Sequence, residues 1–198
     1  SFTQWQTANT DNSLKTYNYT YDALNRITGA IDNLNRYSLN NITYDKNGNI
    51  NTLMRKGHTN AGATAFGTMD NLVYDYFNNS NQLKKVTDAS LTANDGEFID
   101  GNKTGDDYLY DANGNMLIDK NKYINSIEYN YLNLPKNIYI TDHDDLEGYI
   151  YYIYDATGVK LQKKVIDEEE GTVVTTDYVS NYVYENLGLG SSLKFFNN

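Results

Sequence analysis

The sequence predicts an all-β fold built from consecutive antiparallel β-hairpins. Two features of the composition and one repeated motif carry this prediction. The 198 residues include 20 Tyr, a residue that favours half-buried strands. They also include 14 Gly and 29 Asn, which enter the left-handed backbone region with little strain and so form tight turns. Many short strands joined by tight turns are therefore expected.

A turn motif recurs seven times along the chain. A tyrosine precedes Asp, Glu or Asn, and Gly or Asn follows three positions later. Asp at the first position of a type I turn and a left-handed residue at the fourth make a three-residue hairpin loop with a bulge, and the Asp side chain closes an Asx-turn. The residues assigned to the seven turns are Tyr21, Asp22, Asn25, Tyr44, Asp45, Gly48, Tyr74, Asp75, Asn78, Tyr110, Asp111, Gly114, Tyr129, Asn130, Asn133, Tyr154, Asp155, Gly158, Tyr184, Glu185 and Gly188.

The residues between the turns read as strands. Tyr17, Tyr19 and Tyr21 alternate with polar residues at the strand period of two. Residues 57–70 and 88–107 break the rhythm and are expected to be surface insertions between repeats, although a short helix at residues 69–76 or 90–95 also fits the sequence. Residues 1–198 are thus expected to form one repeat segment. Because they begin and end inside repeat-like sequence, we expect an excerpt of a longer protein.

The charge and the hydropathy of the chain argue against two classes of partner. The net charge is −10, and the 16 Lys and Arg residues are scattered. A nucleic-acid partner is not expected, because no basic face is available to pair with phosphates. No apolar run approaches the ~20 residues of a membrane span, so membrane insertion is not expected either. The absence of Cys excludes disulfides and thiolate zinc sites.

Candidate metal sites are weak. Asp142, Asp144 and Asp145 place three carboxylates in a short segment that could hold a surface cation, although a solvated acidic turn is favoured. The loops at residues 45–49 and 111–115 resemble the start of an EF-hand. Their Gly stands at loop position four, whereas an EF-hand needs Gly at six and Glu at twelve. The turn interpretation is therefore favoured.

No catalytic site is expected. His58 lies in a small polar stretch and His143 in an acidic one, and neither has the partners of a nucleophile–base pair. No glycine-rich phosphate loop or zinc spacing is present. The sequence predicts neither an enzyme nor a cofactor.

The repeats resemble the YD repeats of the Rhs family. The resemblance is carried by YDALNRI at residues 21–27, YDKNGNI at 44–50, YDANGNM at 110–116 and YDATGVKL at 154–161. The stretch IEYNYLNLPKNI at 127–138 is similar to a variant in that family, and residues 182–196 resemble its last segment before the C-terminal core. The resemblance covers nearly the whole chain. It implies a spiralling β-sheet that winds into a hollow shell, as in Rhs polymorphic toxins, insecticidal toxin complexes and teneurins.

The resemblance also implies a function. We expect a non-catalytic structural segment of a secreted, extracellular or cell-surface bacterial protein, forming part of the wall of a β-shell that encapsulates or displays a C-terminal toxin or effector. Seven repeats make only a partial shell, and the family's Pro-rich core motif and cleavage aspartates find no match here. The expected partners are the remainder of its own chain, with secretion-machinery or cell-surface proteins. The alternative is a surface adhesion module that binds glycan or protein through exposed Tyr rows.

Overall fold

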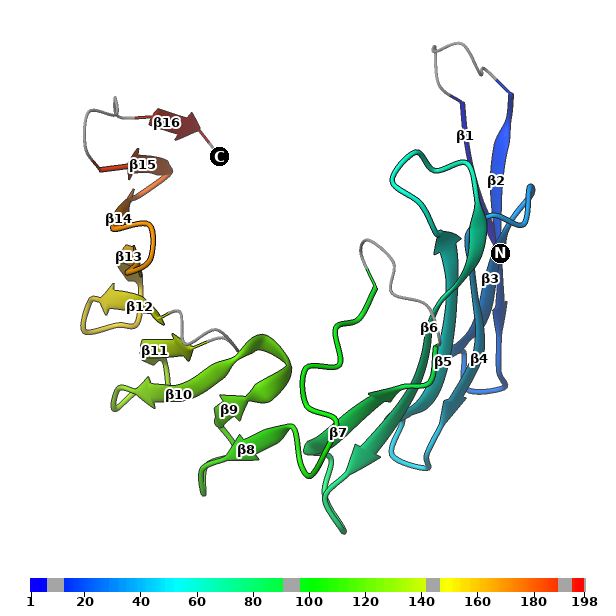
Figure 1. The fold of residues 1–198 in the computed structure, drawn as a ribbon, viewed down its shortest axis with the longest axis horizontal. Coiled ribbons are helices and arrows are strands. Elements are labelled where there is room, and N and C mark those ends of the chain that lie inside the picture. The colour runs from blue at the N-terminus through cyan, green and yellow to red at the C-terminus, as the bar shows by residue number, and fades with distance from the viewer. Residues whose placement is uncertain (7–12, 91–96, 142–146, 189–193, 198) are drawn as a thin grey trace. The chain divides into compact units, whose positions relative to one another are not determined.

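The computed structural model describes residues 1–6, 13–90, 97–141, 147–188 and 194–197, and it confirms the all-β fold class. Within each of two sheets, every strand pairs antiparallel with its neighbours in sequence, which is the order expected of successive hairpins (Figure 1). A seven-stranded sheet contains β1 (Phe2–Trp5), β2 (Lys15–Tyr21), β3 (Ile27–Asp32), β4 (Ser38–Tyr44), β5 (Ile50–His58), β6 (Phe66–Tyr76) and β7 (Leu83–Asp88). A nine-stranded sheet contains β8 (Tyr108–Tyr110), β9 (Met116–Asp119), β10 (Ile124–Tyr129), β11 (Pro135–Thr141), β12 (Glu147–Tyr154), β13 (Lys160–Asp167), β14 (Thr172–Val179), β15 (Tyr182–Asn186) and β16 (Lys194–Asn197).

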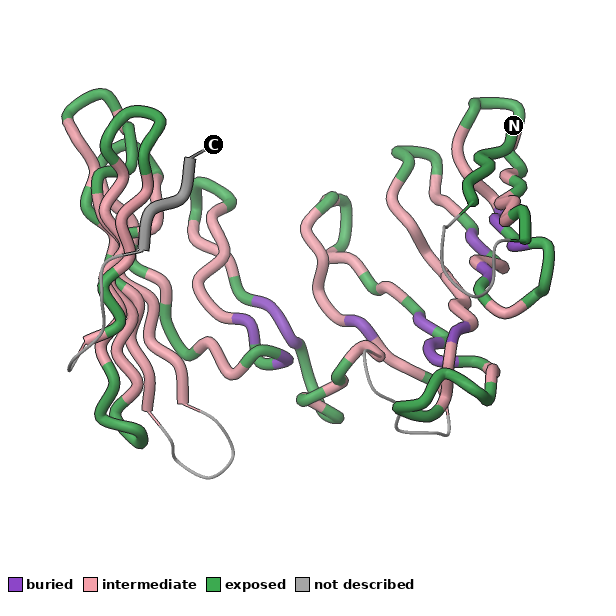
Figure 2. The backbone as a smooth tube through the Cα atoms, turned by 90° about the horizontal axis from the view of Figure 1, so that it is seen from above, coloured by how far each residue is buried: buried purple, intermediate pink, exposed green. Residues whose placement is uncertain are grey.

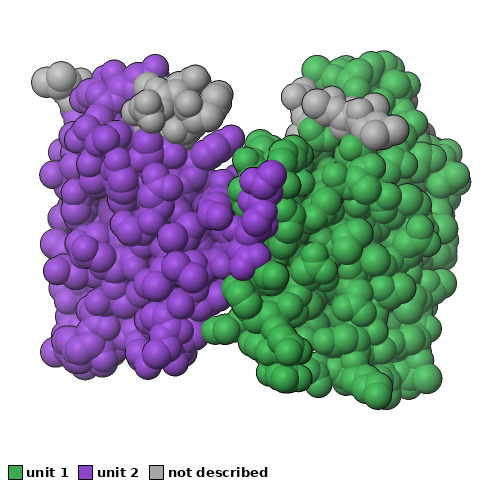
Figure 3. Space-filling model, turned by 60° about the horizontal axis from the view of Figure 1, so that its bottom comes forward, with its two compact units in different colours: residues 1–103 green, residues 104–198 purple. Residues whose placement is uncertain are grey.

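The two sheets belong to two compact units, residues 1–103 and residues 104–198 (Figure 3). Here they are called unit 1 and unit 2, and each is described by itself. The part of the chain that the structure describes holds no helix with the length and hydropathy of a membrane span. Its one helical element is the short 3-10 helix η1 (Lys120–Lys122), which Asp119 caps by accepting the N–H groups of Asn121 and Lys122.

Unit 1 has a thin core on its long strands. Its buried apolar side chains are Ala30, Ile42, Met69, Leu72 and Val86 (Figure 2). Met69 packs against Gly57 of the paired strand so closely that a Cβ at Gly57 would stand 2.2 Å from the Met69 sulfur. The absence of a side chain at residue 57 therefore makes room for the buried methionine.

Residues 57–70 are not an insertion between repeats. Gly57 and His58 end β5, and Phe66–Asp70 begins β6, so only the loop between these strands lies outside the ladder. That loop is closed by Asn60, whose Oδ1 accepts the N–H groups of Thr64 and Ala65. The helix considered at residues 69–76 is also absent, because these residues continue β6. The small polar residues of this stretch make the far end of one long hairpin.

In their described part, residues 88–107 contain no strand after Asp88. The second helix alternative, at residues 90–95, falls on residues 91–96 except for Ser90, and residues 91–96 lie outside the described residues. The stretch that follows, residues 97–103, packs against the strands of unit 1. The Phe98 N–H donates to the buried Asp70 carboxylate at 2.7 Å, and the Lys85 ammonium donates to the Asn102 carbonyl at 3.3 Å. The boundary between the two units falls directly after Lys103.

Unit 2 is apolar on both faces of its sheet. One face carries an aliphatic row in which each residue pairs directly with the next across five strands: Ile127, Ile138, Ile150, Val165 and Val174. The other face carries the stacked rings of Tyr139, Tyr149 and Tyr151. Among the residues whose burial is described, Tyr108 is the only buried apolar side chain of this unit. The sheet is therefore a single layer whose two faces are both only partly covered.

Candidate functional site

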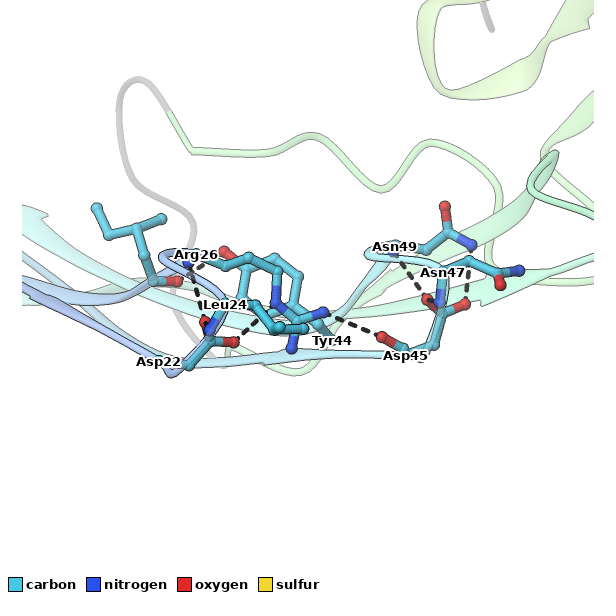
Figure 4. A network of polar contacts seen from close by, with 8 residues as sticks. Asp22, Leu24, Arg26, Tyr44, Asp45, Asn47 and Asn49 are labelled. Carbon is cyan, nitrogen blue, oxygen red and sulfur yellow. Dashed lines mark hydrogen bonds and ion pairs between the residues drawn. The ribbon is translucent and has the colours of Figure 1, made fainter.

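Five of the seven repeat turns share one geometry, which the turn at Asp45 illustrates (Figure 4). The Asp45 Oδ1 accepts the N–H groups of Asn47 and Asn49, both at 2.8 Å, and its Oδ2 accepts the Asn49 side-chain amide at 2.8 Å. The Gly48 N–H donates to the Asp45 carbonyl at 3.3 Å, and Gly48 has a φ of 93°. One short carboxylate thus closes the loop by binding its backbone from inside, as in an Asx-turn.

Four more turns repeat this arrangement. The first residues of these turns, Asp22, Asp111, Asn130 and Asp155, each accept the backbone N–H groups two and four residues later at 2.8–3.1 Å. A register shift of the bulge type precedes each loop, so that each tyrosine pairs with the residue six positions later. The residues three positions after the first all have positive φ: Asn25 at 60°, Gly48 at 93°, Gly114 at 88°, Asn133 at 57° and Gly158 at 91°.

The third turn lies two residues later than the sequence pattern places it. Tyr74 and Asp75 are inside β6, where they pair with Val86 and Lys85. The loop starts at Phe77, and its left-handed residue is Asn79, next to the predicted Asn78. Phe77 has no side-chain acceptor, so no Asx-turn can form. The Phe77 N–H donates to the Gln82 carbonyl, and this loop is one residue longer than the others.

The seventh turn also starts later than expected. Tyr184 and Glu185 are inside β15, where they pair with Asp177 and Thr176 of β14. Asn186 ends the strand, and its Oδ1 accepts the Gly188 N–H at 3.0 Å. Gly188 has the predicted positive φ, at 83°. Asn186 has the side-chain length that an Asx-turn needs, and the longer Glu185 stays in the ladder.

A further turn of the same kind was missed because no tyrosine precedes it. At the opposite end of the hairpins, Asp32 accepts the N–H groups of Leu34, Arg36 and Tyr37 at 3.3, 2.6 and 2.9 Å. Asn35, three residues later, has a φ of 51°. Asp followed by Asn at the fourth position is the signal that could have found this turn.

Three tyrosines of the motif, and Tyr76 before the third turn, each join one repeat to the repeat before it. The Tyr44 hydroxyl donates to the Ile27 carbonyl at 2.6 Å, and Ile27 is the residue that pairs with Tyr21 of the preceding turn. The same bond is made by Tyr76 to Ile50 at 2.8 Å, Tyr129 to Met116 at 2.6 Å, and Tyr154 to Pro135 at 2.9 Å. In every case the acceptor carbonyl stands where the preceding loop re-enters its strand. We call these four bonds the tyrosine ladder.

Side chains of the loops reinforce this ladder. Arg26 in the first turn lies between two turns (Figure 4): it donates to the Asp45 carbonyl at 3.1 Å and stands 4.4 Å over the Tyr44 ring. The amides of Asn47 and Asn49 both donate to the Asn81 Oδ1, at 3.0 and 2.8 Å. In unit 2 the equivalent amides of Asn113 and Asn115 both donate to the Asn133 Oδ1, at 3.1 and 3.0 Å. Successive loops are thus linked into a row within each unit.

The turn carboxylates are acceptors committed to structure. The side-chain amide of Asn115 and the backbone N–H groups of the loop hold the pKa of Asp111 below its usual value. The pKa values of Asp22, Asp45 and Asp155 are lowered in the same way, although for Asp45 the opposing effect of desolvation is the largest single contribution. An ionised carboxylate whose oxygens accept the N–H groups of its own loop stabilises that turn.

The described residues contain no group of three or more His, Cys, Asp or Glu side chains placed to hold a metal ion. The weak metal candidates Asp142, Asp144 and Asp145 lie outside the described residues, as does His143. His58 stands with its ring edge-on to Tyr37, with 6.5 Å between the ring centroids. The His58 Nδ1 is buried and has no hydrogen-bond partner among the described residues.

No protein-family model matches the sequence, and no curated protein matches it either. The resemblance to YD repeats therefore rests on the repeated residues themselves.

Substituting a turn glycine and substituting a turn asparagine should change the stability of unit 1 in different directions. Gly48→Ala should destabilise unit 1 by about 1–2 kcal/mol, because a φ of 93° is strained for any residue with a Cβ even where space is open. Asn25→Gly should be neutral or stabilising, because Asn25 already holds a left-handed φ of 60°. Urea denaturation of the two variants would measure both effects. Equal destabilisation by the two substitutions would contradict a conformational origin.

The tyrosines lead to a prediction for alkaline pH. Hydrogen bonding to Glu147 and desolvation raise the pKa of Tyr149 to about 12, and desolvation raises the pKa of Tyr76, Tyr129 and Tyr154. Unfolded tyrosine titrates near 10, so the stabilisation is complete below about pH 10 and is lost as pH rises through the folded values toward 12. Tyrosinate absorbance and circular dichroism, followed together, should show ionisation coupled to unfolding in this window. Full ionisation of all tyrosines near pH 10 with the sheet intact would refute it.

Proposed function

We propose that this chain is a non-catalytic wall segment of a secreted or cell-surface Rhs-type protein, part of a β-shell that encapsulates or displays a C-terminal toxin or effector. The tyrosine ladder is the observation that carries the proposal. Four tyrosine hydroxyls each donate a hydrogen bond to the loop of the preceding repeat, so neighbouring repeats are joined in the same way in both units. Stability then comes from contacts between neighbouring repeats, as in other repeat proteins. Such a design suits a long wall.

The thin core also supports a wall. In unit 2 both faces of a single-layer sheet carry apolar side chains, and large ones such as Leu109, Ile153 and Val159 are about half exposed. Exposed apolar area of this extent usually marks a surface that another part of a protein covers. An enclosed effector, or further repeats of the same chain, would cover the inner face. Secretion-machinery or cell-surface proteins would meet the outer face.

Cryo-electron microscopy of the full-length protein tests the proposal. The expected result is a continuous β-wall that includes residues 1–198 and surrounds an internal volume. Limited proteolysis gives a second measurement: the C-terminal effector should be protected in the intact protein and digested rapidly when expressed alone. A flat or isolated arm for residues 1–198, with no enclosed volume, would exclude a wall role.

A binding function at the surface is the second candidate. A cavity in unit 1 favours it, because tyrosines of β2 and of the β3–β4 loop line this cavity together with Trp5. Several other tyrosines pack within the sheet or donate to its backbone, so they support the wall. The second candidate therefore concerns one cavity and is compatible with the first.

A further inference from the structure

A cavity of about 470 Å³ lies in unit 1, beside β1, β2 and the loop between β3 and β4. Aromatic rings form much of its wall. Trp5 is 46% exposed and Tyr37 is 40% exposed, so both present ring surface to solvent. Tyr17 and Tyr19 add a pair of rings in edge contact, with 5.4 Å between centroids. Aromatic surface with polar groups nearby, in a cavity of this volume, is typical of sites for small ligands.

The polar lining of the cavity includes two cations. Lys15 and Arg36 line it together with Asp32 and Asn33, in a chain whose net charge is −10. The Lys15 ammonium also donates to the Ser13 hydroxyl at 2.6 Å. The Arg36 Nε is buried and has no hydrogen-bond partner among the described residues, since the Asp32 Oδ2 is 3.9 Å away. The Asp32 carboxylate accepts three backbone N–H groups of its own loop. The cavity therefore sets two cationic donors against one carboxylate, and that carboxylate is engaged by its own loop.

The cavity is preformed. Asn33 fixes the β3–β4 loop to β2: its Oδ1 accepts the Thr16 N–H at 3.2 Å, and its Nδ2 donates to the Leu14 carbonyl at 3.0 Å. The Arg36 guanidinium carbon stands 5.5 Å from the centroid of the Phe66 ring, over its face. The Phe66 ring in turn contacts the Tyr37 ring edge-on. A fixed loop loses little freedom when a ligand binds, which favours affinity.

We propose that this cavity binds a saccharide that carries a carboxylate, such as a uronic-acid oligosaccharide. The apolar face of the sugar ring packs on Trp5 and the tyrosines, and the carboxylate pairs with Arg36 and Lys15. A guanidinium is suited to a carboxylate because its donors match the two oxygens. The inference rests on the second function proposed above, and it names the ligand class and the residues that select it.

The single tryptophan makes the test direct, because Trp5 is the only tryptophan of the chain and lies in the cavity. Trigalacturonate and neutral galactotriose should be titrated into the protein while Trp5 fluorescence is recorded. We expect a saturable change with trigalacturonate and an affinity at least about tenfold lower for galactotriose, because the neutral sugar lacks the charged hydrogen bonds. Arg36→Gln should weaken trigalacturonate binding about tenfold.

Two further variants keep the test decisive. Lys15→Gln should also weaken trigalacturonate binding. Lys15 lies outside the β3–β4 loop, so this variant tests binding even if Arg36→Gln disturbs that loop. Arg26→Gln is the matched control, because its guanidinium lies between two turns and does not line the cavity, so affinity should be unchanged. No Trp5 response to trigalacturonate, an equal response to both sugars, or unchanged affinity in both cavity variants would overturn the proposal. None of these results would bear on the enclosed volume by which the wall function is judged.

Discussion

Asp70→Ala should lower the free energy of unfolding of unit 1 by about 3 kcal/mol, because the buried carboxylate accepts hydrogen bonds from a guanidinium and from a backbone N–H group. Asp70 is 1% exposed and stands at the centre of a local network. Its Oδ2 pairs with the Arg55 guanidinium on the neighbouring strand, and its Oδ1 accepts the Phe98 N–H at 2.7 Å. Removing the carboxylate leaves the partly buried Phe98 N–H group without this acceptor and releases the segment after β7 from the sheet.

Asp75→Ala is the matched control for this prediction. Asp75 lies on the same strand, β6, but is exposed, so its removal should change stability by no more than about 0.5 kcal/mol. Urea denaturation followed by circular dichroism would measure both variants, and hydrogen exchange would show whether the Phe98 amide loses protection. A similar small effect for the two substitutions would mean that the Asp70 network contributes little to stability.

The double variant Tyr44→Phe with Tyr76→Phe should destabilise unit 1 by about 2 kcal/mol, or about 1 kcal/mol for each hydrogen bond. Phenylalanine keeps the ring and removes only the hydroxyl, so the loss isolates the tyrosine ladder from packing. The carbonyls of Ile27 and Ile50 lose their donors at the point where the preceding loops re-enter the sheet. We expect the amides of these preceding loops to exchange faster with solvent.

Tyr21→Phe is the control for the ladder, because the Tyr21 hydroxyl forms its hydrogen bond with an exposed Ser1 hydroxyl, at 3.0 Å, and the residue is 47% exposed. This substitution should be nearly neutral. Faster exchange confined to the altered repeats themselves, with the preceding loops unaffected, would show that the hydroxyls do not couple neighbouring repeats.

Local chemistry explains how far the sequence pattern could go. In five turns the accepting side chain, the two N–H groups that donate to it and the left-handed residue all fall within five consecutive residues. These turns start at Asp22, Asp45, Asp111, Asn130 and Asp155. Such a loop depends on few distant contacts, and so its residues predict it. The third turn is different, because Tyr74-Asp75 matches the motif but Asp75 pairs with Lys85 in the ladder. Strand register decided that case.

The sequence by itself determined the alternation of strands and turns, the sites of five left-handed loops and the all-β class, because all of these follow from interactions between near neighbours in the chain. The tertiary structure alone decided which carbonyl each tyrosine hydroxyl reaches, because acceptor and donor are 13 to 26 residues apart. It also decided the burial of Asp70 against Arg55, the division into two sheets after Lys103, and the cavity that joins Trp5 to Arg36. Each of these depends on strand register and on which strands become neighbours, and a repeat motif with variable spacing does not encode that locally.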